Sequence, residues 1–139
     1  MIEMTLTLAL QAAEATRLKA AALGLAMTVS VVEEAGRLVL TLRGDGTGFL
    51  TTDTSRAKAV AALTFKRATI ELAALHATQP FWSHVSAASK GEALPTGGAV
   101  PILLGGRLIG AIGCGGGSPE QDHDCAQAGA AAVAASAAR

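Results

Sequence analysis

The stretch AVPILLGGRLIGAIGC, residues 99–114, decides the fold of this chain. It contains two apolar runs of strand length separated by Gly105-Gly106, and paired glycines tolerate the positive φ angles of a two-residue hairpin turn. The sequence therefore predicts an antiparallel hairpin with strands at 99–104 and 107–114. Counting outward from the turn predicts three cross-strand pairs: Leu103 with Leu108, Ile102 with Ile109, and Pro101 with Gly110.

A helix is predicted directly after this hairpin. Ser118-Pro119-Glu120-Gln121 has the pattern of a capping box, with proline at the first helical position and acidic side chains in the first turn. The helix then continues through alanine-rich sequence. The glycine-dense segment 113–117 therefore links a strand to the N-terminus of a helix.

The chain before the hairpin contains helices and one more hairpin. Apolar residues at helical spacing predict a helix from an N-cap at Thr7 to Gly24, and residues 28–32 and 38–42 alternate as two strands with a tight link. Three further segments follow: a helix from Thr52 or Asp53, a short helix capped by Thr69 and running through His76, and a partly irregular crossing with one short strand at 81–96. This order predicts an α+β protein with helices packed on an antiparallel sheet, not a doubly wound parallel sheet.

Composition limits the size, the partners and the location of the protein. The 139 residues form one domain, 1–139, and 11 basic residues balance 11 acidic ones, which argues against nucleic acid and against a polybasic membrane surface. No signal peptide or long apolar run is visible, so we expect a cytoplasmic protein. Large side chains are scarce, with 31 Ala against 17 Leu, and we expect a homo-oligomer to supply the missing apolar burial.

The glycine-rich turn has two readings that the residues leave open. Free backbone N–H groups of Gly113, Gly115, Gly116 and Gly117 at a helix N-terminus predict a site for a small carboxylate or phosphate. The same glycines are also typical of a turn that needs tight backbone packing. A dinucleotide site is strongly disfavoured, because Ser118 replaces the third glycine of the fingerprint and no strand is predicted after it.

Several side chains are candidates for chemistry near this turn. Lys58, on a helix face otherwise made of alanine, either extends to water or binds a ligand carboxylate. Asp122 and His123 could act as an acid–base pair, although Asp122 also suits the helix dipole. His76 and His84 are alternative haem ligands or bases, or else solvent-facing residues. Cys114 is either a buried strand residue or a nucleophile at a helix N-terminus.

Two further residues extend the set of ligand-binding candidates. Thr47 lies in the Gly-rich loop 44–48, which is either a flexible link or a lid. Trp82, next to Phe81, is predicted to line a pocket or an interface. No metal site is predicted, since Cys114 and Cys125 lack the spacing of a zinc motif.

Three stretches together resemble the GlcG/HbpS-like family: Gly97–Ile102, Gly106–Gly113 and Gly116–Asp122. The resemblance extends to the opening Leu6-Thr7-Leu8, the hairpin 29–36 and Ala57-Lys58-Ala59, so it covers nearly the whole chain. It implies a profilin-like, five-stranded antiparallel sheet flanked by helices, and assemblies from dimers to octamers. Some members bind haem or a corrinoid, but haem ligation is not part of the shared motif.

These observations lead to one main functional hypothesis. We expect an oligomeric protein that binds haem or another small anionic molecule near the glycine-rich turn, with Lys58, Gly97 and Gly98 beside it. The alternative is a small catabolic hydrolase or isomerase that acts on an unsaturated or hydroxy acid in the same pocket, with Lys58, Asp122 and His123 as catalytic residues. A third possibility is an accessory subunit without a ligand.

Overall fold

A computed structural model describes residues 3–137 of the chain as helices and strands in an α+β arrangement. The elements, in chain order, are α1 (Leu6–Ala22), β1 (Thr28–Glu33), β2 (Leu38–Leu42), α2 (Thr51–Phe65), α3 (Thr69–Leu75), α4 (Phe81–Ala88), β3 (Ala99–Leu104), β4 (Arg107–Gly115) and α5 (Pro119–Ala137). None of the described helices is long and apolar enough to cross a bilayer.

The sheet is antiparallel and has the strand order β2-β1-β4-β3. It contains four strands within the described residues, so the expectation of a fifth strand is wrong. The segment that was expected to supply a short strand, 81–96, instead begins with helix α4. In this helix the buried Val85 and the partly buried Trp82 belong to an apolar cluster with α2, which holds α4 in place.

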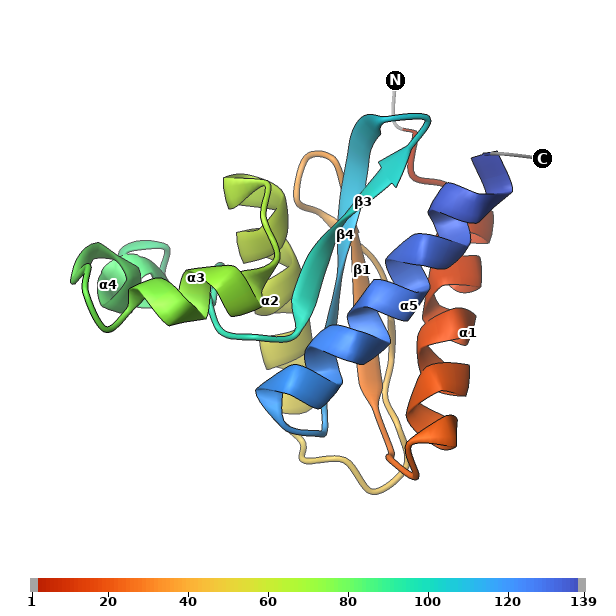
Figure 1. Ribbon diagram of the computed structural model, residues 1–139, viewed down its shortest axis with the longest axis horizontal. Coiled ribbons are helices and arrows are strands. Elements are labelled where there is room, and N and C mark those ends of the chain that lie inside the picture. The colour runs from red at the N-terminus through yellow and green to blue at the C-terminus, as the bar shows by residue number, and fades with distance from the viewer. Residues whose placement is uncertain (1–2, 138–139) are drawn as a thin grey trace.

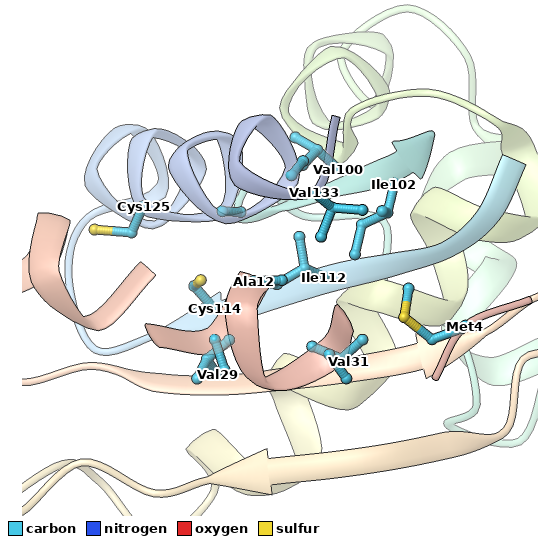
Figure 2. Packing of buried hydrophobic residues seen from close by; sticks show 14 of the residues in the cluster. Met4, Ala12, Val29, Val31, Val100, Ile102, Ile112, Cys114, Cys125 and Val133 are labelled. Atoms are coloured by element: carbon cyan, nitrogen blue, oxygen red, sulfur yellow. The ribbon is translucent and has the colours of Figure 1, made fainter. Parts of the chain in front are cut away.

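Helices cover both faces of the sheet, as Figure 1 shows. Helices α1 and α5 lie side by side on one face, and α2 lies on the other, with α3 and α4 extending away from the sheet beyond α2. Figure 2 shows the main core between the sheet and α1 and α5, where Val29 and Val31 of β1 meet Ile112 and Cys114 of β4. Because side chains alternate along a strand, the intervening positions, Ser30 in β1 and Gly113 in β4, face α2 on the other side of the sheet.

The face under α2 combines small and polar residues with a buried apolar cluster that contains Val32. Gly113 is its closest point of approach, because a Cβ at this position would lie 2.1 Å from the carbonyl oxygen of Ser55. The buried hydroxyl of Ser30 lies 2.7 Å from those of Ser55 and Thr41, so hydrogen bonds also connect the sheet to the helix. Close packing of α2 on the sheet places Lys58 over the end of β4.

The β3–β4 hairpin forms as predicted around Gly105-Gly106, but its register shifts by one residue. Leu103 pairs with Leu108 as expected, whereas Ile102 pairs with Gly110 and Pro101 with Ala111. Ile109 is the extra residue of a β-bulge, and counting from a turn cannot detect a bulge.

The helix termini agree with the sequence in part. The capping box at Ser118 is confirmed, with its Oγ accepting from Gln121 N at 3.1 Å and Gln121 Oε1 accepting from Ser118 N at 2.9 Å. The N-cap of α1 is Thr5 and not Thr7, because Thr5 has the extended backbone of a cap and accepts from Leu8 N. Thr69 is the first residue of α3, not its cap, and its hydroxyl bonds to the backbone of Ala99.

Candidate functional site

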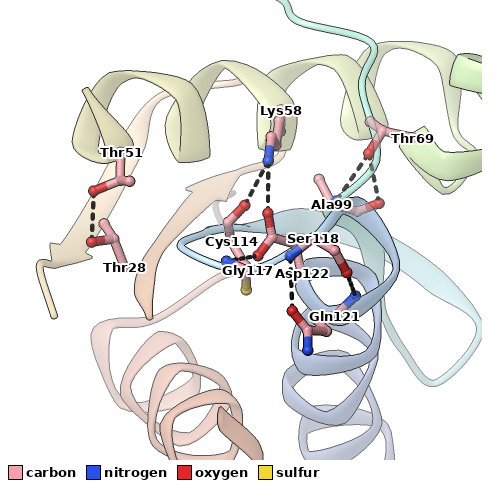
Figure 3. A network of polar contacts seen from close by, with 10 residues as sticks. All are labelled: Thr28, Thr51, Lys58, Thr69, Ala99, Cys114, Gly117, Ser118, Gln121 and Asp122. Carbon is pink, nitrogen blue, oxygen red and sulfur yellow. Dashed lines mark hydrogen bonds and ion pairs between the residues drawn. The ribbon is translucent and has the colours of Figure 1, made fainter. Parts of the chain in front are cut away.

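Lys58 and Asp122 form a buried ion pair at the junction of α2, β4 and α5 (Figure 3). Lys58 Nζ lies 3.1 Å from Asp122 Oδ2 and donates to the carbonyl oxygen of Cys114 at 3.0 Å. The Lys58 side chain is 10% exposed and that of Asp122 is 4% exposed. Lys58 therefore does not extend to water, and its charge is balanced inside the protein.

The electrostatics of this pair combine two opposing effects. Burial raises the pKa of the Asp122 carboxyl above its ordinary value of 3.8, because the ionised form loses its water. The Lys58 ammonium and the Gly117 N–H act in the opposite direction, but burial is the larger effect. In the folded chain the ionised form of Asp122 is therefore less favoured than in water, even with Lys58 beside it.

The amides of the glycine-rich turn are not all free. Gly117 N donates to Asp122 Oδ1 at 2.8 Å, and Ser118 N donates to Gln121 Oε1. Cys114 N donates to the carbonyl oxygen of Gly98. The Asp122 carboxylate therefore occupies the position between Lys58 and Gly117 in which a small external anion was expected.

Close packing accounts for several of the predicted glycines. Gly98 has a φ of +135°, and a Cβ there would lie 2.9 Å from both Lys58 Nζ and the Cβ of Asp122. A Cβ would also be crowded at three neighbouring glycines, by Pro119 at Gly97, by Ser55 O at Gly113 and by Ala26 O at Gly116, whereas at Gly115 it would make only an ordinary contact with Thr51. The absence of a side chain at Gly98 lets its backbone lie directly against the ion pair.

Of the other predicted residues, Thr47 and Trp82 lie apart from this pair, whereas His123 directly follows Asp122 in the chain. Thr47 is buried and its hydroxyl bonds to Gly44 O and to the hydroxyl of Thr28, so it secures the 44–48 loop. His123 lies next to Asp122 on α5, and its Nδ1 is buried without a hydrogen-bond partner among the described residues. Trp82 belongs to α4, a different part of the molecule.

An apolar groove lies between α4 and the end of α2. Its cavity volume is about 350 Å³, and its lining is Phe65, Phe81, His84, Val85, Ala88 and Ser89. Phe81 is 58% exposed, and the ring of Trp82 packs edge-on against both Phe65 and Phe81 with centroids 4.9 Å apart. The groove therefore combines apolar walls with an exposed imidazole. The sequence analysis named His84, Phe81 and Trp82 as candidates but did not predict that they lie together.

Two lysines flank this groove in the sequence and were not singled out by sequence reasoning. Lys66 directly follows Phe65, and Lys90 directly follows Ser89. Both are exposed, both have a left-handed backbone with φ of 56°, and neither forms an ion pair within residues 3–137. Sequence reasoning had no signal for these positions, because the left-handed residue after a helix is usually glycine and not lysine.

Comparison with known proteins identifies the family. The family model described as "Haem degrading protein HbpS-like" matches residues 4–131. An uncharacterized 15.0 kDa protein from the dhaT-dhaS intergenic region of Citrobacter freundii is 32% identical over 122 residues, which are 86% of this chain and 84% of that protein. The chain belongs to the HbpS-like family.

Solved structures agree with this assignment. The crystal structure of protein ORFY from Klebsiella pneumoniae superposes with a TM-score of 0.87 at 30% identity, covering 95% of this chain and 91% of that one. A crystal structure of a PduOC:heme complex has a TM-score of 0.83 at 30% identity and covers 94% of each chain. The α+β fold is thus shared with a protein that has been crystallised with haem.

Proposed function

We propose that this protein binds a haem-type ligand, meaning a flat and largely apolar molecule that carries carboxylates, in the groove between α2 and α4. Family membership and the PduOC:heme structure favour this class of ligand. The observation that carries the proposal is the groove itself, because it offers Phe65, Phe81 and Val85 on its walls beside the imidazole of His84.

The properties of the groove fit this class of ligand. Ligand sites are mostly apolar, with a few polar groups, and have volumes of about 300–1,000 Å³. At about 350 Å³ the groove encloses part of a porphyrin and leaves the rest exposed or covered by another copy of the chain. Lys66 and Lys90, which follow the lining residues Phe65 and Ser89 in the chain, would supply positive charge for carboxylates at the edge of such a ring.

The test uses Trp82, which is the one tryptophan of a chain without tyrosine. A porphyrin in the groove would lie close to this indole and quench its emission. Titration with metal-free protoporphyrin IX should therefore quench Trp82 saturably in the wild type. The variant Phe81→Ala should weaken binding about tenfold, because a buried aromatic contact of about 1–2 kcal/mol is lost.

Phe49→Ala is the matched control, since Phe49 is also an exposed phenylalanine, 76% exposed, but lies in the loop before α2. Its affinity should equal that of the wild type. Equal weakening by both variants would show non-specific adsorption to exposed rings, and lack of quenching in the wild type would refute binding at the groove.

We also propose a carboxylate position at the glycine-rich turn, in competition with Asp122. Lys58 Nζ and Gly117 N both contact the Asp122 carboxylate, so an external carboxylate must replace it to bind there. Asp122→Ala should therefore gain thermal stability when formate is added, whereas the wild type should not. The alternative function, a small hydrolase or isomerase with Lys58, Asp122 and His123 as catalytic residues, stays a prediction.

The proposed assembly is a homo-oligomer. Leu6, Leu10 and Leu18 on α1 are between 46% and 65% exposed, although leucine is usually buried. A shallow depression of about 340 Å³ lies beside Leu18, between α1 and Ala132 of α5. The outer face of α1 and α5 is therefore the surface that we propose for contact between copies.

A further inference from the structure

Few side chains of this protein are able to hold the iron of a haem. Haem iron is bound in proteins by His, Cys, Met or Tyr. The chain has no tyrosine, and Cys114 and Cys125 are completely buried in the core. Met4 and Met27 are each 4% exposed and also belong to the core. Within residues 3–137, the histidines are therefore the available iron ligands.

The three histidines occupy different environments. His76 is half-buried, and its Nε2 lies 3.1 Å from the carbonyl oxygen of Pro95. His123 is half-buried on α5 with a buried Nδ1. His84 is exposed, lines the groove, and makes no hydrogen bond or ion pair within the described part of the chain. Of the three, His84 has a ring that is accessible from an apolar groove.

The position of His84 on α4 explains this accessibility. Phe81, His84, Val85 and Ala88 follow the spacing i, i+3, i+4 and i+7, so they form one stripe along the helix. Phe65 from α2 forms the opposite wall. A ring that packs against Phe65 and Phe81 would thus lie beside the imidazole of the same stripe.

We propose that His84 is the axial ligand through which this protein binds haem iron. The inference rests on the proposed function and adds to it the residue that selects a metalloporphyrin over a metal-free one. With haemin in the groove, a ring nitrogen of His84 would donate its lone pair to the ferric iron, and a water or hydroxide would leave the iron. No electron is transferred in this step.

The experiment compares haemin with protoporphyrin IX on the full chain. In the wild type, both ligands should quench Trp82, and haemin should also give a sharpened and shifted Soret band. His84→Ala should bind protoporphyrin IX within about twofold of the wild type, but should bind haemin at least about tenfold more weakly, because a metal ligand is lost. Free imidazole should restore the Soret band of the His84→Ala complex.

His76→Gln is the matched control, as it removes an imidazole outside the groove and should leave both titrations unchanged. If His84→Ala keeps the wild-type haemin spectrum, the assignment of His84 is wrong while binding in the groove stands. If neither ligand quenches Trp82 in the wild type, the groove is not the binding site and the proposed function itself fails. A thermal melt of each variant verifies that it is folded.

Discussion

The carboxylate of Asp122 contacts a cation from one helix and an amide from the turn that begins its own helix. Both charges of the Lys58–Asp122 pair are buried, so neither can be removed without affecting the other. Because the desolvation of Asp122 outweighs the attraction of Lys58, the loss of the lysine and the loss of the carboxylate should change the stability of the protein by different amounts.

Replacing Lys58 with methionine should destabilise the protein by about 3–5 kcal/mol at pH 7, because Asp122 then remains as a buried charge without a counter-charge. The double variant Lys58→Met, Asp122→Asn should recover most of this loss, since no buried charge remains. Urea denaturation of the two single variants and the double variant measures the coupling. Additive effects in this cycle would show that the two side chains do not depend on each other.

The pH dependence of stability should reflect the raised pKa of Asp122. Its folded pKa lies above the ordinary value of 3.8, so the folded chain binds this proton more tightly than the unfolded chain. The resulting stabilisation is fully present below pH 3.8 and is lost as the pH rises through the folded pKa. The stability of Asp122→Asn relative to the wild type should therefore increase with pH across this window.

Urea midpoints of the wild type and Asp122→Asn, measured in parallel from pH 3 upward, test the sign. A wild type that instead gains stability over the variant as the pH rises would mean that Lys58 lowers the pKa of Asp122 more than burial raises it.

Among the elements, α2 depends on the absence of a side chain in β4. Alanine at Gly113 would place its Cβ 2.1 Å from Ser55 O and 3.0 Å from Ala59 N, so α2 must move away from the sheet. Gly113→Ala should therefore cost about 3 kcal/mol or more, as overpacking of a rigid backbone contact does. Gly48→Ala is the control, because its Cβ meets no atom within 4 Å.

Thermal unfolding of both glycine variants gives the comparison. A small effect at Gly113 would mean that α2 can shift without loss of packing, and it would also question the placement of Lys58. The same shift should weaken the Lys58–Asp122 contact, so the effect of Lys58→Met should be smaller in a Gly113→Ala background.

The elements that could be predicted from the sequence are those with strong local signals. The Gly105-Gly106 turn and the Ser118 capping box define the last hairpin and α5 by local chemistry alone. Helix α4 was missed, because eight residues are too few to show a clear helical periodicity, and Phe65, which packs against it, lies 16 residues before Phe81. The bulge at Ile109 depends on both strands and so has no local signal.

The candidate site shows the same limit. Sequence reasoning selected Lys58, Gly98, Gly117 and Asp122, which the fold does bring together. It could not predict that the Asp122 carboxylate accepts the hydrogen bond from the Gly117 amide in the turn, since this depends on the rotamer of one side chain. The sequence analysis grouped Thr47 and Trp82 with these residues. Trp82 instead packs against Phe65, a tertiary contact away from the glycine-rich turn that no local pattern predicts.

At the scale of the whole molecule, the exposed leucines predict self-association. Light scattering should give a mass of at least twice the 13.9 kDa of one chain. The variant Leu6→Lys, Leu18→Lys should lower that mass, because two charges would be buried in the contact. Thr64→Lys, on the exposed side of α2, is the control and should not. A monomeric wild type would exclude the proposed assembly.

The strand order β2-β1-β4-β3 also determines when the molecule can fold. The two central strands come from residues 28–33 and 107–115, and α1 packs against α5, so α1 and β1 cannot complete their packing before β4 and α5 are made. Contacts so distant along the chain close slowly. On the ribosome, α1 and the first hairpin therefore emerge without their partners and stay exposed until β4 and α5 have been made. This interval is when nascent copies are most liable to aggregate and to need a chaperone.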